Sequence, residues 1–281
     1  MKAVRVTAAQ DRTLNIAPLP LPTAHRKGEA SAERYRQQSK GQLPRGNSFN
    51  PLPSDFLRAI VLSDGKFQGL GSQPGSLLSF VISGDVTLIA GPSQTCQLGP
   101  GDILLTDERS SPSVALDARN QGRLLQIGVA TDWPGSEAEI QAPGTINPRK
   151  EPMPNVKRVY TGEDDKAYIT GFPELFPNAC NQWSTPRRIT GFRMLCWEDG
   201  WMDFHPCVIN QIGIISSGEL EVQVGGGSGA KEVFRAGDIC LTEDRTGEGH
   251  LNRIRGAMFV TNLVIETEDL WPRMRSATRH E

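Results

Sequence analysis

The stretch GPGDILLTD at residues 99–107 returns as RAGDICLTE at residues 235–243, 136 residues later. Three further pairs of short segments repeat at almost the same spacing: LSDG at 62–65 with WEDG at 197–200, VISG at 81–84 with ISSG at 215–218, and TDWP at 131–134 with DLWP at 269–272. Their offsets are 135, 134 and 138 residues, so the two copies stay in register with very small insertions. The chain therefore contains a duplicated domain.

Each copy reads as a series of short strands. RITGFRMLCWEDG at 188–200 is rich in aromatic and β-branched residues and closes at Asp-Gly, a turn signal. In ELEVQV at 219–224, polar and apolar residues alternate, as they do in a strand with one buried face. Gly-Asp at 237–238 precedes ICLTE, and AMFVTNLVIE at 257–266 follows as a late strand. Short strands with glycine turns predict an all-β sandwich or barrel.

Composition limits the classes of function. The 281 residues suit two domains, and 37% hydrophobic content is sufficient for two cores. The formal net charge of −2 offers no basic surface for nucleic acid or an anionic membrane. The start, MKAVRVTAAQDR, lacks the apolar core of a signal peptide, and we expect a soluble cytoplasmic protein. Five scattered cysteines without a CxxC pair indicate free thiols in a reducing compartment.

The domain boundaries follow from the repeat. We expect an N-terminal strand and extended arm at 1–56, a first domain at 57–134, a proline-rich linker at 135–156 and a second domain at 157–275. Residues 22–50 are polar and nearly free of large aliphatic side chains, so they cannot form a core. They are expected to be an arm, with a short helix near 29–39, that wraps a partner or covers the mouth of a barrel.

The repeated segments resemble the cupin superfamily. The resemblance rests on SGELEVQV, AGD and EDRTGEGH in the second copy, which are similar to small single-domain cupins, and on the repeat itself for the first copy. It implies a bicupin, with two tandem jelly-roll barrels behind the extended N-terminal arm. The resemblance extends over about residues 57–134 and 157–275.

The resemblance also implies positions for metal ligands. In the stretch FHPCVINQ at 204–211, His205 occupies the first histidine position, Cys207 the second and Gln211 the position of the usual glutamate. The second motif, which begins at Gly237, ends at His250. In the first copy the matching positions hold Leu77 and Val114, so we expect no metal in the N-terminal barrel and assign it a structural role.

Strand alternation places several polar side chains on one face. If 202–212 is a continuous strand, Asp203, His205, Cys207 and Gln211 share a face, because alternate residues of a strand point the same way. A polar face inside a barrel is costly unless it is hydrogen-bonded or binds something. His250 points into the same cavity by the cupin pattern.

Four interpretations of this cluster remain open. In the first, His205, Gln211 and His250, joined or not by Cys207, hold one divalent ion such as Fe, Mn, Ni or Zn. In the second, Asp203 supplies the carboxylate of a facial triad with the two histidines. In the third, His205, Gln211 and His250 act without a metal, as hydrogen-bonding or acid–base groups. In the fourth, the histidines are ordinary core residues.

Other residues are candidates for substrate contacts. Asp203 and Arg245 could bind polar groups of a substrate. The remaining members of the acidic turn are expected at the rim, and Cys207 is either a soft ligand or a small buried filler. An aromatic pocket could be lined by a set gathered mainly in the second copy: Trp183, Phe192, Trp197, Trp201 and Phe259.

The function expected from the sequence is modification of a small organic substrate in the C-terminal barrel. We expect an isomerase, cyclase or lyase step that uses a divalent metal or a histidine acid–base pair. Two alternatives are a metal-dependent dioxygenase and a non-catalytic binding or structural bicupin, because the fold does not select among them. A homodimer is also expected.

Overall fold

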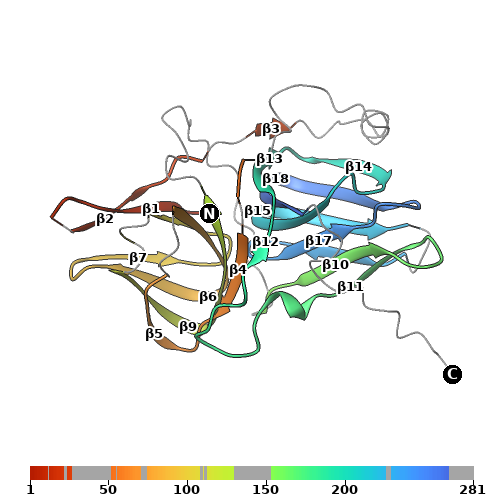
Figure 1. Cartoon of the computed structure of the whole chain (residues 1–281). Helices are drawn as coiled ribbons and strands as arrows, with labels where there is room; N and C mark the ends of the chain where they lie inside the picture. Colours follow the sequence, from red (N-terminus) through yellow and green to blue (C-terminus); the bar gives the residue numbers. More distant parts are fainter. Residues whose placement is uncertain are drawn as a thin grey trace.

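The computed structural model describes residues 1–11, 13–21, 24–26, 52–54, 56–70, 75–107, 110, 113–129, 153–225 and 229–265. These residues form two β-barrels side by side, and a short helical element among them is the 3-10 turn η2 (Pro173–Leu175) (Figure 1). No helix in the described ranges is long and apolar enough to cross a membrane. The predicted all-β fold of two tandem barrels is confirmed.

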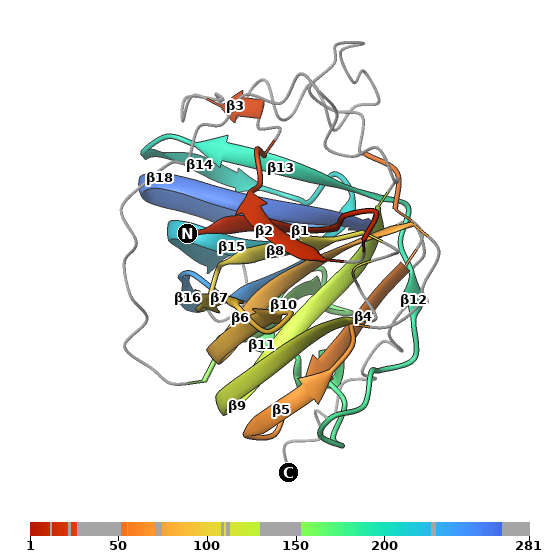
Figure 2. The ribbon, with the colours of Figure 1, turned by 90° about the vertical axis from the view of Figure 1, so that its left-hand side faces the viewer.

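The strands of the two barrels follow the order of the repeat. The N-terminal barrel contains β1 (Ala3–Ala8), β2 (Leu14–Pro18), β4 (Phe56–Val61), β5 (Gly65–Gln68), β6 (Ser76–Ala90), β7 (Gln94–Leu98), β8 (Ile103–Thr106) and β9 (Val114–Val129). The C-terminal barrel contains β10 (Val156–Thr161), β11 (Ala167–Gly171), β13 (Gly191–Trp197), β14 (Gly200–His205), β15 (Asn210–Val224), β16 (Lys231–Phe234), β17 (Ile239–Glu243) and β18 (His250–Ile265). Figure 2 shows the long strands β6 and β9 crossing the N-terminal barrel.

Long bent strands close each barrel. The pairing of β15 with β18 shifts register around Ser217, next to Gly218, whose φ of +79° glycine tolerates best. The first part of β15 pairs with β17, and the second part pairs with β16. The result is two layers, β13-β18-β15-β17 and β14-β18-β15-β16. The N-terminal barrel repeats this order as β4-β9-β6-β8 and β5-β9-β6-β7, the arrangement of a jelly roll.

The repeated Gly-Asp pair has a structural cause. Gly237 has a φ of +83°, and the carboxylate of Asp238 accepts the N–H of Arg235 at 2.7 Å and that of Asn155 at 2.8 Å. Asp238 thus stabilises the turn and holds the start of β10, the strand that pairs with β17. In the first copy, Asp102 accepts the N–H groups of Gly99 and Lys2 in the same way.

The duplication is longer than the repeated motifs indicate. β10 pairs in parallel with β17 and antiparallel with β11, and β1 pairs in the same two ways with β8 and β2. Residues 3–18 therefore belong to the N-terminal barrel, although the sequence pattern grouped them with the arm.

The two halves also exchange short strands. β3 (Ala24–Arg26), from the arm, pairs with β13 of the C-terminal barrel (Figure 1). β12 (Arg187–Arg188), from the second copy, pairs with β4 of the N-terminal barrel, next to a bridge between Ile60 and Trp183. The whole predicted arm helix near 29–39 and most of the linker lie outside the described residues, as do the TDWP and DLWP segments.

Among the described residues, three hydrophobic clusters form the core. One fills the N-terminal barrel, one fills the C-terminal barrel, and the largest lies between the barrels. Strand alternation divides these clusters: Ile212 and Ile214 of β15 face the other barrel, whereas Ile215 and Val222 face inward. Knowing which face a residue occupies therefore tells whether it lines a barrel or joins the two.

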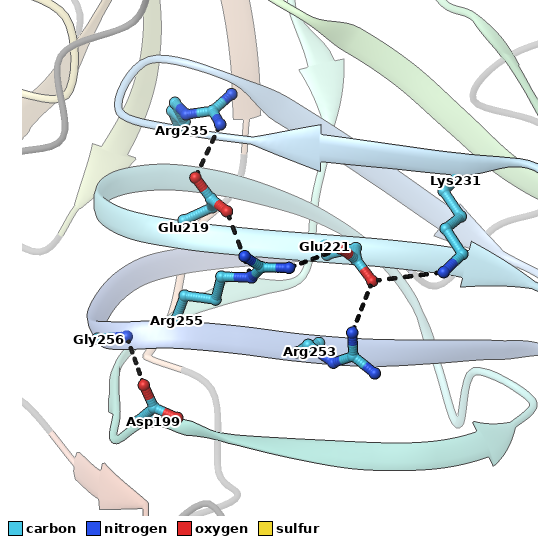
Figure 3. A network of polar contacts seen from close by, with 8 residues as sticks. All are labelled: Asp199, Glu219, Glu221, Lys231, Arg235, Arg253, Arg255 and Gly256. Atoms are coloured by element: carbon cyan, nitrogen blue, oxygen red, sulfur yellow. Dashed lines mark hydrogen bonds and ion pairs between the residues drawn. The ribbon is translucent and has the colours of Figure 1, made fainter.

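The outer face of the C-terminal barrel carries a charged network (Figure 3). Glu221 of β15 lies between Lys231 on one side and Arg253 and Arg255 on the other, at 3.3–3.9 Å. The predicted alternation along 219–224 is confirmed, because Val222 and Val224 are buried inside the barrel. These outward charges are separate from the polar side chains inside.

Candidate functional site

Two histidines lie side by side inside one end of the C-terminal barrel. His205 ends β14, His250 begins β18, and the two are cross-strand partners. Their ring centroids are 4.7 Å apart, and the side chains are 5% and 4% exposed. The two histidines that the sequence placed at ligand positions are thus brought together by strand pairing.

A buried carboxylate orients His250. Nδ1 of His250 lies 2.6 Å from Oδ2 of Asp244, and Asp244 is fully buried. Oδ1 of Asp244 is also buried and has no hydrogen-bond partner among the described residues. The backbone carbonyl of Asp244 accepts the N–H of Cys207 at 2.9 Å, which fixes the loop beside it. Asp244 therefore belongs to the cluster, and the expectation that it lies at the rim is wrong.

The surroundings of His205 keep its ring neutral. Nδ1 of His205 lies 2.6 Å from the backbone oxygen of Asp203. Burial, and then the neighbouring His250, lower the pKa of His205 to about 4. At neutral pH this imidazole is therefore a hydrogen-bonding group without charge. The carboxylate of Asp203 accepts the N–H of Phe204 at 2.9 Å.

The strand expected over 202–212 is interrupted. β14 ends at His205 and β15 begins at Asn210, so strict alternation does not relate Asp203 and His205 to Cys207 and Gln211. Pro206 explains the break, because proline has no N–H for a strand partner. The expectation that these residues share one strand face is wrong. A backbone hydrogen bond from the N–H of Cys207 to the carbonyl oxygen of Asp244, not alternation, holds these two residues together.

Cys207 is a buried thiol. Its Sγ donates to the carbonyl oxygens of Ile209 and Thr242. Burial, with a further contribution from Asp244, raises the pKa of Cys207 to about 12. Both contacts of Sγ are to backbone carbonyl oxygens, so the geometry favours the filler interpretation over the soft-ligand interpretation. All five cysteines are free, as the sequence predicted.

Gln211 lies at the same end of the barrel but in the other layer. It pairs with Thr242 of β17, and its Oε1 accepts a hydrogen bond of 3.2 Å from Nη2 of Arg193. Arg193 shares the inward face of β13 with Leu195 and Trp197. Both Arg193 and Gln211 are partly exposed, whereas Leu195 and Trp197 farther along the same face are buried. This end of the barrel interior is therefore polar and in contact with solvent.

The donor set decides how well a metal fits. Among the described residues, no three His, Cys, Asp or Glu side chains are grouped so that they could hold a metal ion. Gln211 is the remaining predicted ligand, and its amide oxygen is engaged by Arg193. The described residues supply two imidazoles and no third donor of the usual kind. They do not fit a centre with three protein ligands.

Several predicted substrate contacts lie elsewhere. Trp201 is 58% exposed on the outer face, opposite Arg253, while its neighbour Met202 packs inside the barrel. Phe192 and Phe259 face the other barrel. The expectation that these three line an interior pocket is wrong, because their strand positions turn them outward. Trp197 lies in the inner core, Trp183 packs on the N-terminal barrel, and Arg245 is exposed on the turn after Asp244.

Two residues near the histidines were not singled out by sequence reasoning as members of the cluster. Asp244 stands in an acidic turn, and nothing local separates it from the exposed Glu248. Arg193 had a usable signal: it lies 135 residues after Arg58, the offset of the repeat, so an arginine recurs on the same strand of both barrels.

Comparisons with known proteins give likenesses of fold. No family model and no curated protein matches the chain. Similar solved structures include a cupin 2 conserved barrel domain protein from Leptotrichia buccalis, at 11% identity over 81% of this chain and 95% of that one, with a TM-score of 0.38. A protein of unknown function from Pseudomonas syringae pv. tomato is 13% identical over 94% of this chain and 100% of that one, with a TM-score of 0.37.

A third similar structure is the oxalate decarboxylase of Lactobacillus farciminis, solved as a formate complex. It is 15% identical over 76% of this chain and 77% of that one, with a TM-score of 0.27. The jelly-roll layers agree with the cupin resemblance at the level of the fold. None of these likenesses carries a substrate, metal or reaction over to this chain.

Proposed function

We propose that the C-terminal barrel is an acid–base site for a small organic molecule. In this site His250 transfers a proton to or from the molecule, and Asp244 orients the His250 ring. The observation that carries this proposal is the 2.6 Å contact between Nδ1 of His250 and a fully buried carboxylate. A carboxylate at Nδ1 holds the imidazole as the Nδ1–H tautomer and stabilises the charged imidazolium. The lone pair at Nε2 is then the base.

The surroundings of Nε2 suit this role. No hydrogen bond from Nε2 of His250 to any described residue occurs, and this nitrogen is not among the fully buried unpaired atoms. A substrate C–H, O–H or N–H that reaches Nε2 would lose its proton there and regain one at the same or another atom. Such transfers produce isomerisations, cyclisations and eliminations, which are the reaction classes expected from the sequence.

His205 supports the same chemistry in a different way. It lies beside His250 with its pKa lowered to about 4, so it does not take up the proton that His250 carries. A neutral imidazole in this place provides a hydrogen bond to a substrate without adding a second positive charge. The two neighbouring histidines thus have different roles in one acid–base site: His250 transfers the proton, and His205 forms a hydrogen bond to the substrate.

The polar end of the barrel supports a small polar substrate. Arg193 and Gln211 bring polar groups to the partly exposed interior of the C-terminal barrel. The rest of the interior is hydrophobic, with Trp197 and Val260 in its core. A pocket with an apolar wall and a few fixed polar groups is typical of sites for small organic molecules.

The competing candidate is a metal-dependent reaction at the same histidines. The observation in its favour is that Nδ1 of each ring is held by an oxygen, as in histidines that bind a metal through Nε2. An ion bound here would take its other ligands from water or substrate. Metal analysis of protein produced with Mn, Fe, Ni and Zn supplied separates the candidates: close to one ion per chain favours the metal, and a trace amount favours the acid–base site.

The direct test of the proposal is proton exchange. Small carbonyl compounds and hydroxy acids are incubated with the protein in D2O, and NMR follows the loss of each C–H signal. The proposal predicts that at least one compound class exchanges a C–H proton in the presence of the wild-type protein. This exchange should be lost in His250→Gln. It should be retained in Arg245→Ala, a control that alters the exposed neighbour of Asp244. Exchange that continues undiminished in His250→Gln would contradict the assignment of the base.

A further inference from the structure

A buried arginine lies inside the N-terminal barrel, for which the sequence predicts no ligand. Arg58 is on the inward face of β4 with Ile60, and it is 6% exposed. Its Nε donates to Oε1 of Gln126 at 2.8 Å, and its Nη2 donates to the same oxygen and, at 2.6 Å, to the carbonyl of Leu70. These acceptors are neutral.

The charge of Arg58 is not balanced by a carboxylate in the described part of the chain. No ion pair of Arg58 with a described residue occurs. Burial lowers the pKa of Arg58 to about 10, so the guanidinium is still charged at neutral pH. An unpaired charge inside a protein is costly, which is why buried charges are normally paired.

Aromatic rings compensate only part of this charge. The guanidinium carbon of Arg58 lies 4.2 Å from the centroid of the Trp183 ring and 5.7 Å from that of Phe56. A cation–π contact contributes about 0.5–2 kcal/mol, less than the several kcal/mol that a buried ion costs. Trp183 therefore offsets part of the charge but is not a counter-ion.

Nη1 is the atom that a ligand would meet. Nε and Nη2 are occupied, whereas Nη1 makes no hydrogen bond to a described residue and is not among the fully buried unpaired atoms. Nη1 therefore keeps contact with solvent. Gln126 also has a second contact, because its Nε2 donates a hydrogen bond to the hydroxyl of Ser79 at 2.9 Å. This bond fixes the orientation of the amide beside Arg58.

The repeat provides independent support. Arg58 faces Gln126 across β4 and β9, and Arg193 faces Asn262 across β13 and β18. Both barrels thus place an arginine opposite a side-chain amide at the same inward position. Leu77 and Val114 of the first copy replace the polar residues of the second, yet the arginine and the amide are present in both.

We infer that the N-terminal barrel binds a small oxyanion of the carboxylate class through Arg58, in the plane of its guanidinium and beside Gln126. The anion supplies the negative charge that the described residues do not. Its site is separate from the histidine pair in the C-terminal barrel, and the inference is independent of the function proposed there.

The test is a titration with acetate, formate and oxalate at constant ionic strength, set against chloride. Isothermal calorimetry and thermal unfolding of the full chain are followed at pH 7.5. We expect saturable binding of at least one carboxylate and a rise in Tm of about 2–4 °C at saturation, which chloride does not reproduce.

Two variants locate the site. Arg58→Met removes the charge, and Gln126→Glu places a carboxylate of the chain against the guanidinium. We expect each variant to lower the affinity of the protein for the carboxylate at least tenfold. Gln126→Glu should also raise Tm in buffer alone, so it reports on the site even if Arg58→Met does not fold. His250→Gln, in the other barrel, should bind the anion as wild type does.

Three results would overturn the inference. One is no saturable binding of any of the three carboxylates by the wild-type protein. The second is binding that Gln126→Glu leaves intact. The third is binding lost in His250→Gln but kept in Arg58→Met, which would place the anion in the C-terminal barrel.

Discussion

His205 and His250 are cross-strand partners on β14 and β18, with ring centroids 4.7 Å apart inside the C-terminal barrel. Nδ1 of His250 contacts the buried carboxylate of Asp244, and Nδ1 of His205 contacts the backbone oxygen of Asp203. The same pair of histidines therefore has two different partners, and the proposed division into a proton-transfer group and a neutral neighbour follows from that difference.

The stability of the protein should depend on pH through His205. Its pKa is about 4 in the folded protein, against 6.5 for an unperturbed histidine, so the unfolded chain binds this proton more readily. The stabilisation is complete above pH 6.5 and is lost as the pH falls from 6.5 toward 4, by a total of about 3 kcal/mol. Urea unfolding at pH 7.5 and at pH 4.5 measures it.

The control for this pH dependence is His205→Asn, which removes the titrating ring. The difference in unfolding free energy between the two pH values should shrink by about 2–3 kcal/mol in the variant. An unchanged difference would mean that other groups cause the pH dependence.

Asp244→Asn should impair proton transfer without removing the base. An asparagine amide at Nδ1 no longer stabilises the imidazolium and favours the wrong tautomer, so kcat should fall by about 100-fold or more. The readout is kcat with the compound that the exchange test identifies, over a range of pH. Glu248→Gln, at an exposed carboxylate on the same turn, should keep the wild-type rate; an equal loss there would argue against a specific role for Asp244.

The thiols should differ widely in reactivity. Cys180 is exposed, whereas Cys207 is buried with its pKa raised to about 12. A thiol reagent at pH 8 should label Cys180 quickly and Cys207 only after unfolding, because the thiolate is the reactive form. Mass spectrometry of the labelled protein and of Cys180→Ser checks this, and rapid labelling of Cys207 in the folded protein would rule out a buried thiol.

The Gly-Asp turn should be important for stability. Asp238→Ala removes the acceptor of two backbone N–H groups, those of Arg235 and Asn155, and should lower the free energy of unfolding by about 2–3 kcal/mol. Asp199→Ala, which removes the exposed acceptor of one N–H, that of Gly256, should cost less than about 1 kcal/mol. Equal losses in urea unfolding would contradict this explanation of the repeat.

The repeat was sufficient to predict two β-barrels, because glycine turns and strand alternation recur at fixed spacing. It did not reveal that β1 and β10 are equivalent, since the Asp102 and Asp238 carboxylates bind the backbone N–H groups of Lys2 and Asn155, the residues just before these strands. A backbone N–H leaves no mark on residue identity, so such an equivalence is absent from the residue pattern.

The sequence predicted the histidine pair but not its partners. The burial of Asp244 depends on how the turn after β17 packs, and its neighbours Arg245 and Glu248 are exposed. The positions of Trp201 and Phe192 also depended on which strand face points inward, and composition does not settle that. Pro206 was the one local signal that the strand ends at His205.

The measurement that tests the central claim most directly is the tautomeric state of His250, read from the 15N chemical shifts of its ring at pH 7.5. The account predicts a proton on Nδ1 and a bare Nε2 in the wild-type protein, and a shift toward the Nε2–H tautomer in Asp244→Asn. A proton on Nε2 in the wild-type protein, or ring shifts that Asp244→Asn leaves unchanged, would contradict it.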